Sequence, residues 1–241
     1  MAVYPEDCIQ SFVSPWWTTD ATNDLRVGRL VRAYIPHVEQ ESLAIRVNGR
    51  TMPTNHTSVD ISVVPLSATA PPPAPAIPVA GFPHYGGEVY MVQRAKLRPA
   101  IVVSVEPPLV QFPKGSPPWQ SFQTVYVAPA YGCDQSGSRG GWDRGIMGRI
   151  KTCMYPQYML DKLPLAGAEW SVVRFDQIQP ISRSHSSFVV TEHCLSEDAV
   201  DVIHDWVSWI HTGEVADGGY IDVFQTDMAD RAARATKPAG Q

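Results

Sequence analysis

Arg98 is the residue whose type and position most clearly suggest chemistry. It lies in KLRPAIVVSV (96–105), where Lys96 and Arg98 precede an unbroken run of small and β-branched residues. Such a run is typical of a strand buried on both faces, and Pro99 restricts the backbone beside the arginine. A guanidinium stays charged at any working pH and donates paired hydrogen bonds that fit a phosphate. The sequence therefore predicts a charged arginine at the mouth of a buried strand, in a chain that is acidic overall.

A glycine-rich loop, GCDQSGSRGGWDRG (132–145), follows a second predicted strand and could contribute to the same site. Its hydroxyl, guanidinium and indole groups could bind phosphate oxygens or stack on an unpaired base. The RNA-binding candidates in the loop are Ser136, Ser138, Arg139, Trp142 and Arg144. The loop has no phosphate-loop signature, so the alternative is a long polar turn whose charged residues pair with each other.

His84 precedes the predicted strand GEVYMVQ (87–93) and is a further RNA-binding candidate. The ordinary pKa of histidine, about 6.5, suits proton transfer, and the alternative is an exposed loop histidine. The 4 cysteines are widely scattered, with neither a CxxC motif nor a zinc-finger spacing. We expect reduced thiols and predict no metal and no cofactor.

The composition limits which classes of protein this chain can belong to. The chain has 241 residues, a formal net charge of -5, 44% hydrophobic residues and 22 prolines. This is globular composition, and the acidic balance argues against coating nucleic acid by bulk charge. No apolar run is long enough to cross a membrane, and the N-terminus does not resemble a signal peptide. The expectation is a cytoplasmic protein without a membrane partner.

The elements that must position these residues are mainly strands. Many prolines and turn signals favour short strands over parallel βαβ units. Strands are predicted over 29–38, 42–47, 58–66, 87–93, 98–105, 121–129, 145–151 and 171–181. Residues 155–165 are expected to form one or two helical turns. A long amphipathic helix is predicted over 196–213, where Ser196 is a suitable N-cap and Gly213 a suitable C-terminal stop.

The chain divides by composition into four parts. LSATAPPPAPAIPVAGFP (66–83) favours an extended polyproline conformation and reads as a linker or arm. The predicted organisation is a β-rich N-terminal extension over 1–65, this arm, a barrel domain over 84–212, and a partly disordered tail over 213–241.

The order of motifs in residues 87–211 resembles the PemK/MazF toxin family. The resemblance rests on the following segments, in chain order: GEVYMVQ, a short basic turn, RPAIVVS, TVYVAP, a variable loop, EWSVVRFDQIQPIS and a final amphipathic helix. The late strand SVVRFDQIQPI matches the family pattern at its apolar positions and at its Asp-Gln pair. The resemblance covers about half of the chain. It implies a mainly β (α+β) fold, with an SH3-like small β-barrel of the CcdB/MazF type and a C-terminal helix.

The resemblance also implies an activity and partners. Family members are metal-independent endoribonucleases, usually homodimers held in check by an antitoxin, in which the ribose 2′-OH of single-stranded RNA attacks the adjacent phosphate. Arg98 matches the family's arginine. Its usual partner is a Thr or Ser, whereas Tyr131 stands there in this chain, so the expected catalytic pair is Arg98 and Tyr131. Arg94 and Lys96, in the short loop between the first two strands, are RNA-binding candidates.

Tyr131 leaves a second interpretation open. A phenol donates hydrogen bonds but is a poor base near neutral pH, since its ordinary pKa is about 10. Catalysis could therefore use Tyr131, use Ser136 or Ser138, or be absent. The alternative function is a catalytically inactive module of the same fold that binds a protein partner or nucleic acid.

Overall fold

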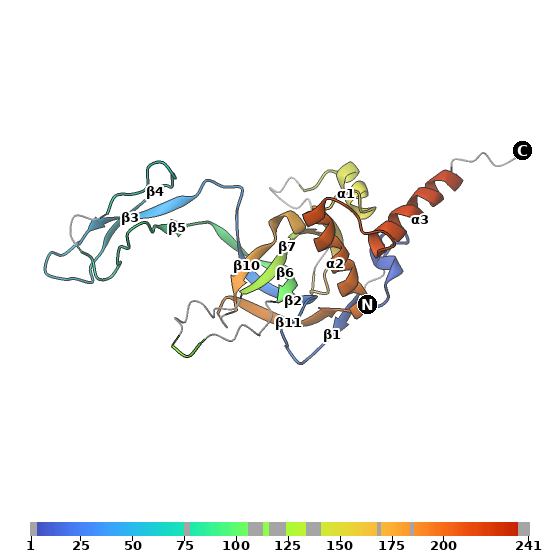
Figure 1. Ribbon diagram of the computed structural model, residues 1–241, viewed down its shortest axis with the longest axis horizontal. Helices are drawn as coiled ribbons and strands as arrows, with labels where there is room; N and C mark the ends of the chain where they lie inside the picture. The colour runs from blue at the N-terminus through green and yellow to red at the C-terminus, as the bar shows by residue number, and fades with distance from the viewer. Residues whose placement is uncertain are drawn as a thin grey trace, which may run out of the picture. The chain divides into compact units, whose positions relative to one another are not determined.

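The chain is described by a computed structural model that covers residues 4–74, 78–105, 113–115, 124–133, 141–167, 170–183 and 186–235. It forms two compact units (Figure 1). Unit 1 comprises residues 1–34 and 97–241, and unit 2 comprises residues 35–96. The predicted boundaries at 65, 83 and 212 do not coincide with this division, because the first two strands of the chain belong to unit 1. Among the described residues, no helix is long and apolar enough to span a membrane.

The chain is mostly β, and its sheets are antiparallel, in agreement with the mainly β prediction. The larger sheet has the strand order β1-β11-β2-β6-β7-β9-β8, with β10 paired to β7 off this path, and it is not a closed barrel. Its strands are β1 (Trp17–Thr19), β2 (Arg29–Pro36), β6 (Ala95–Val105), β7 (Thr124–Gly132), β8 (Tyr158–Lys162), β9 (Trp170–Arg174), β10 (Gln179–Ser182) and β11 (Phe188–Leu195).

The smaller sheet belongs to unit 2 and has the order β4-β3-β5. These strands are β3 (Leu43–Gly49), β4 (Asp60–Pro65) and β5 (Tyr90–Val92). The described part of the Ala/Pro-rich segment has no helix or strand. It is nevertheless anchored within unit 2, because Val79 is buried and the Pro78 carbonyl accepts two hydrogen bonds from the Arg50 guanidinium.

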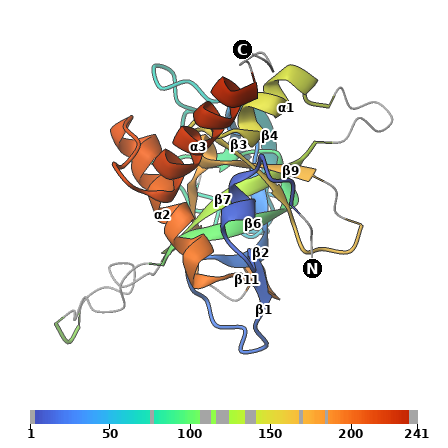
Figure 2. The same cartoon turned by 90° about the vertical axis from the view of Figure 1, so that its right-hand side faces the viewer.

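Helices cover the core of unit 1. Two short 3-10 turns, η1 (Ile9–Phe12) and η3 (Phe175–Gln177), accompany α1 (Arg144–Lys151), α2 (Glu197–Thr212) and α3 (Tyr220–Ala235). Figure 2 shows α2 and α3 side by side. Side chains of α2 such as Ile203 and Trp206 pack with strand residues such as Ile101 and Val173 in one buried cluster. The core of unit 1 therefore lies between its sheet and these helices.

The long helix predicted over 196–213 is confirmed as α2. The Ser196 side chain accepts a hydrogen bond from the backbone N–H of Ala199, and Gly213 ends the helix with a φ of 78°. Only glycine adopts that left-handed conformation without cost. The apolar face of this amphipathic helix is buried at Ala199, Ile203 and Trp206 and partly buried at Val207 and Ile210.

Three element predictions were wrong. Residues 171–181 form two strands, β9 and β10, separated by η3, instead of one strand. Residues 145–151 form a helix instead of a strand, because the carboxylate of Asp143 accepts hydrogen bonds from the N–H groups of Gly145 and Ile146 and caps α1. Residues 158–162 form β8 instead of helical turns, since the sheet buries Met159 and Leu160. The tail also differs from the prediction, because α3 continues to Ala235.

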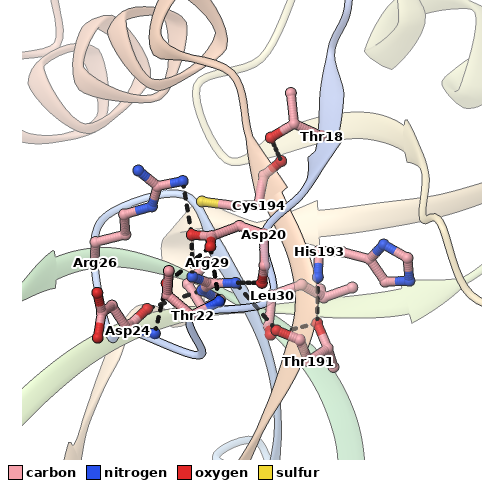
Figure 3. A network of polar contacts seen from close by, with 10 residues as sticks. All are labelled: Thr18, Asp20, Thr22, Asp24, Arg26, Arg29, Leu30, Thr191, His193 and Cys194. Atoms are coloured by element: carbon pink, nitrogen blue, oxygen red, sulfur yellow. Dashed lines mark hydrogen bonds and ion pairs between the residues drawn. The ribbon is translucent and has the colours of Figure 1, made fainter.

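A buried arginine fixes the segment between β1 and β2 (Figure 3). Arg29 is fully buried, and its guanidinium donates to the carboxylate of Asp20, to the carbonyl oxygens of Asp20 and Asp24, and to the carbonyl oxygen of Thr191 in β11. A buried charge is tolerated when it is paired and hydrogen-bonded in this way. Hydrogen bonds from Thr22 and the nearby Arg29 guanidinium lower the pKa of Asp20 to about 2.

Candidate functional site

Arg98 and Tyr131 lie together because of the register between β6 and β7. Ala100 is the partner of Pro129, so extending the antiparallel register by two residues places Arg98 opposite Tyr131. Directly opposed side chains on one face of a sheet are close enough to interact. The guanidinium carbon of Arg98 lies 4.2 Å from the centroid of the Tyr131 ring, a cation–π contact.

A displaced segment brings a second arginine to the same tyrosine. β9 ends its pairing with β7 at Val173, and β10 resumes it at Gln179. Residues 174–178 therefore leave the ladder with β7, in which only residues 128 and 129 stand opposite them, while Arg174 remains paired with β8. The η3 turn occupies this displaced segment. Its first residue, Arg174, has its guanidinium carbon 5.8 Å from the Tyr131 ring centroid.

Cations and aromatic rings alternate from this point along the surface of unit 1. Arg174 is the register partner of Tyr158 in β8, and its guanidinium carbon lies 5.2 Å from that ring centroid. Tyr158 contacts Tyr155 edge to face, and the guanidinium of Arg149 in α1 lies over Tyr155 at 5.7 Å. We call this set the arginine–tyrosine row; its members are Arg98, Tyr131, Arg174, Tyr158, Tyr155 and Arg149.

The two arginines around Tyr131 differ in their partners. Arg174 donates two hydrogen bonds to Asp176, at 2.7 and 2.6 Å, and these bonds are the main cause of the raised pKa of Arg174. Arg98 forms no ion pair with any described carboxylate, and its buried Nε has no hydrogen-bond partner among the described residues. A buried donor without a partner costs about 1–3 kcal/mol. Of the two arginines beside Tyr131, Arg98 is therefore the one whose positive charge has no described carboxylate partner.

The Tyr131 hydroxyl is positioned by the displaced segment. It donates a hydrogen bond to Oε1 of Gln177 in η3. The phenol is therefore held in one orientation, and both guanidinium groups lie near its ring. Asp176, the carboxylate of the same turn, is occupied by Arg174 and is not available as a base.

The other predicted site residues are distributed unevenly. Trp142 is half-buried and contacts Tyr158 edge to face, with ring centroids 5.3 Å apart, so it borders the row. Arg144 is exposed at the first position of α1. Arg94, Lys96 and His84 belong to unit 2, where all three are exposed. Ser136, Ser138 and Arg139 lie outside the described residues.

Several members of the row were not predicted from the sequence. Arg174 and Tyr158 become neighbours only through the pairing of β8 with β9, and residues 155–165 had been assigned to helical turns. Arg149 was placed in a strand, so its position on α1 could not be foreseen. The sequence feature that could have indicated the position of Arg174 is the Arg-Phe-Asp-Gln stretch at 174–177, where charged residues interrupt an apolar strand.

The row provides cations and aromatic faces and no metal site. Within the described parts of the chain, no group of three or more His, Cys, Asp or Glu side chains could hold a metal ion. Guanidinium groups alternating with tyrosine rings are suited to a single-stranded nucleic acid, since phosphates pair with the former and bases stack on the latter. No known family model matches this chain, and comparison with curated proteins and with solved structures found no match.

Proposed function

We propose that the arginine–tyrosine row binds single-stranded RNA and that the protein cleaves it as a metal-independent endoribonuclease of the PemK/MazF type. The observation that carries the proposal is Arg98, a half-buried guanidinium with an unused donor and no described carboxylate partner. An oxyanion bound to the accessible part of the guanidinium would supply the missing counter-charge. Tyr131, Arg174 and Tyr158 extend the same surface with groups that suit neighbouring nucleotides.

The proposed reaction is an attack by the ribose 2′ oxygen on the adjacent phosphorus. A bond forms between these atoms and the bond to the 5′ oxygen breaks. The 2′ proton passes to solvent water, and the leaving 5′ oxygen takes a proton from the Tyr131 hydroxyl, which is reprotonated by water. The products are a 2′,3′-cyclic phosphate and a 5′-hydroxyl. Arg98 stabilises the negative charge that develops on the phosphoryl oxygens. The Tyr131 hydroxyl can donate a proton to the leaving oxygen.

A second candidate function is binding of RNA without cleavage. It is favoured by the engagement of Asp176 with Arg174, which leaves the row without a free carboxylate base from that turn. Both functions use the same surface, and they differ in whether the phosphodiester bond breaks.

The test combines a cleavage assay with a binding assay. A long RNA is incubated with the protein in EDTA, and the ends of the products are identified. A 2′-deoxy-substituted oligonucleotide, which cannot be cleaved by this route, reports binding by fluorescence anisotropy. We expect discrete 2′,3′-cyclic-phosphate ends with the wild type. Arg98→Ala should reduce both cleavage and affinity by at least about tenfold, because a charge-assisted contact contributes about 1.5–3 kcal/mol.

Two further variants separate the roles. Tyr131→Phe keeps the ring and removes the hydroxyl, so we expect retained binding and cleavage reduced by about 100-fold, within the range of general acid catalysis. Arg234→Ala, at an exposed position of α3, removes the same charge as Arg98→Ala and should change neither readout. Binding without cleavage across varied RNAs would replace the first function by the second. Equal affinity of wild type and Arg98→Ala would overturn both.

The proposal extends to the assembly. A PemK/MazF-like toxin would be a homodimer with an SH3-like barrel and would bind a protein antitoxin. Light scattering coupled to size-exclusion chromatography measures the first of these directly: a mass near twice 26.5 kDa supports the dimer, and a mass near 26.5 kDa contradicts it.

A further inference from the structure

A second site lies away from the arginine–tyrosine row, where the N-terminal segment meets β11. A pocket with a volume of about 770 Å³ opens there, and aromatic side chains form much of its wall: Tyr4, Trp16 and Trp17. Its polar lining includes Gln10, Thr19 and His193. The volume falls within the range of about 300–1,000 Å³ that is usual for small-molecule sites.

The three aromatic residues converge on one carboxylate behind the wall. Asp161 of β8 is fully buried. The Tyr4 hydroxyl donates to it at 2.8 Å, and the indole Nε1 atoms of Trp16 and Trp17 donate at 3.3 Å and 3.2 Å. A side chain that forms three such bonds fixes the orientation of all three rings.

These donors are neutral, so the charge of Asp161 is not cancelled. No described lysine, arginine or histidine forms an ion pair with Asp161, and nearby Lys151 pairs with Asp7. Burial raises the pKa of Asp161 to about 6, which leaves the carboxylate ionised at neutral pH. Burial and the same carboxylate also raise the pKa of Tyr4, so Tyr4 stays a proton donor. The wall of the pocket thus holds a buried negative charge without a counter-ion.

The aromatic wall is held in place before any ligand binds. Trp17 begins β1, and the Thr18 hydroxyl of that strand donates to the carbonyl of Cys194 in β11 at 2.9 Å. The segment that follows β1 is fixed by the Arg29 network of Figure 3. A preorganised site loses less conformational entropy on binding.

We propose that this pocket binds a small organic cation that carries a methylated ammonium group. Trp and Tyr faces attract such cations through their quadrupoles. Methyl groups favour the apolar rings over water, and the Asp161 carboxylate supplies the missing opposite charge. Hydrogen bonds from the indole N–H groups to that carboxylate add electron density to the rings and strengthen the attraction.

The experiment compares choline with 3,3-dimethyl-1-butanol, which has the same shape but a neutral carbon in place of the ammonium nitrogen. Both are titrated into the full-length protein at pH 8 by calorimetry, and the indole N–H signals are followed by ¹H–¹⁵N NMR. We expect choline to bind at least about tenfold more tightly than the isostere, in line with about 2 kcal/mol for a desolvated cation–π contact. The indole signals of Trp16 and Trp17 should shift.

Variants identify the groups responsible. Asp161→Asn should weaken choline binding by about tenfold and leave the isostere within about twofold, whereas Asp201→Asn, on the exposed face of α2, should change neither. If Asp161→Asn does not fold, Trp17→Leu at a half-buried position of β1 serves instead and should weaken choline binding by a similar factor.

Two outcomes would overturn the proposal. One is equal affinity for choline and its neutral isostere, or no heat and no indole shift with either. The other is a folded Asp161→Asn variant that keeps the full preference for choline. A different outcome is that a trimethyl-lysine peptide binds more tightly than choline while its unmodified form does not. That result would support the same chemistry and would identify the ligand as a methylated lysine side chain of a protein.

Discussion

At the scale of single residues, the two arginines beside Tyr131 perform different tasks. Arg174 is tied to Asp176 by two hydrogen bonds and serves mainly to support one side of the ring. Arg98 has no such carboxylate partner among the described residues, so its charge is available for the RNA phosphate that we propose it binds. Because the tyrosine faces screen both cations from each other, two positive groups can share a small area of an acidic protein.

Asp161 gives a prediction for the pH dependence of stability. Its pKa is about 6 in the folded protein and 3.8 ordinarily, so the folded state holds this proton more tightly. Ionisation therefore favours unfolding: stability present below about pH 4 is lost as pH rises through about 6. This difference in pKa corresponds to about 3 kcal/mol of the free energy of unfolding, since one pH unit corresponds to about 1.36 kcal/mol. We expect the wild type to lose this amount relative to Asp161→Asn between pH 4 and pH 7.

Urea unfolding at several pH values measures the difference. The comparison with Asp161→Asn cancels the titration of other groups, among them Asp20, whose lowered pKa makes its contribution disappear only in strong acid. Parallel stability curves for the two proteins would show that the pKa of Asp161 is the same in the folded and unfolded states and would contradict the raised value. A loss of stability that continues at a constant slope beyond pH 7 would show that Asp161 stays protonated there and would remove the charge from the pocket.

Only part of the candidate site could be predicted from these residue types. Arg98 and Tyr131 were identified from the motif, and the β6–β7 register explains why they meet. Arg149 and Tyr155 were not, because their contact depends on a helix that a single cap, Asp143, establishes. The pocket was missed since its carboxylate and its indoles lie more than 140 positions apart in the chain.

At the scale of elements, Gly28 joins two strands and a helix. It has a φ of 82°, its N–H donates to the Val102 carbonyl of β6, and its carbonyl accepts from the Leu195 N–H at the end of β11. A Cβ at this position would lie 2.7 Å from Cγ2 of Val200 in α2. The glycine is therefore required both by its backbone conformation and by close packing.

Gly28→Ala should destabilise the protein by about 2–4 kcal/mol, the combined cost of a left-handed alanine and an overpacked contact. Thermal and urea unfolding provide the measurement. Gly148→Ala is the matched control: the added Cβ meets nothing within 4 Å in α1, and alanine should stabilise that helix by about 0.5–1 kcal/mol. A loss below about 0.5 kcal/mol for Gly28→Ala would contradict this account.

At the scale of the whole molecule, unit 2 is an insertion between two neighbouring strands. β2 leads into it and β6 leads out of it, and the two strands are adjacent in the larger sheet. The core cluster of unit 1 contains no residue from 35–96. Composition predicted a boundary at the Ala/Pro-rich segment instead, because proline content marks extended chain but not where long-range strand pairing begins and ends.

Replacing residues 35–96 by a short Asn/Gly turn should therefore leave unit 1 folded. We expect cooperative thermal unfolding, dispersed methyl signals in NMR spectra, and RNA affinity within about threefold of the full chain, since the arginine–tyrosine row lies wholly in unit 1. Loss of cooperative unfolding would show that unit 1 requires the insertion. Folding with loss of RNA affinity would instead assign a binding role to Arg94, Lys96 or His84.

The displaced segment at 174–178 has an evolutionary consequence. Strand residues are constrained on both sides by their ladder partners, whereas this segment leaves the ladder and returns to it at Gln179. Within it, Phe175 is buried against Trp206, whereas Asp176 is exposed and Gln177 half-buried, so the latter two side chains can be exchanged without altering the register of β9 or β10. Ligand preference at these two positions is thus separated from the stability of the sheet, and selection or directed mutagenesis can change one while the other is kept.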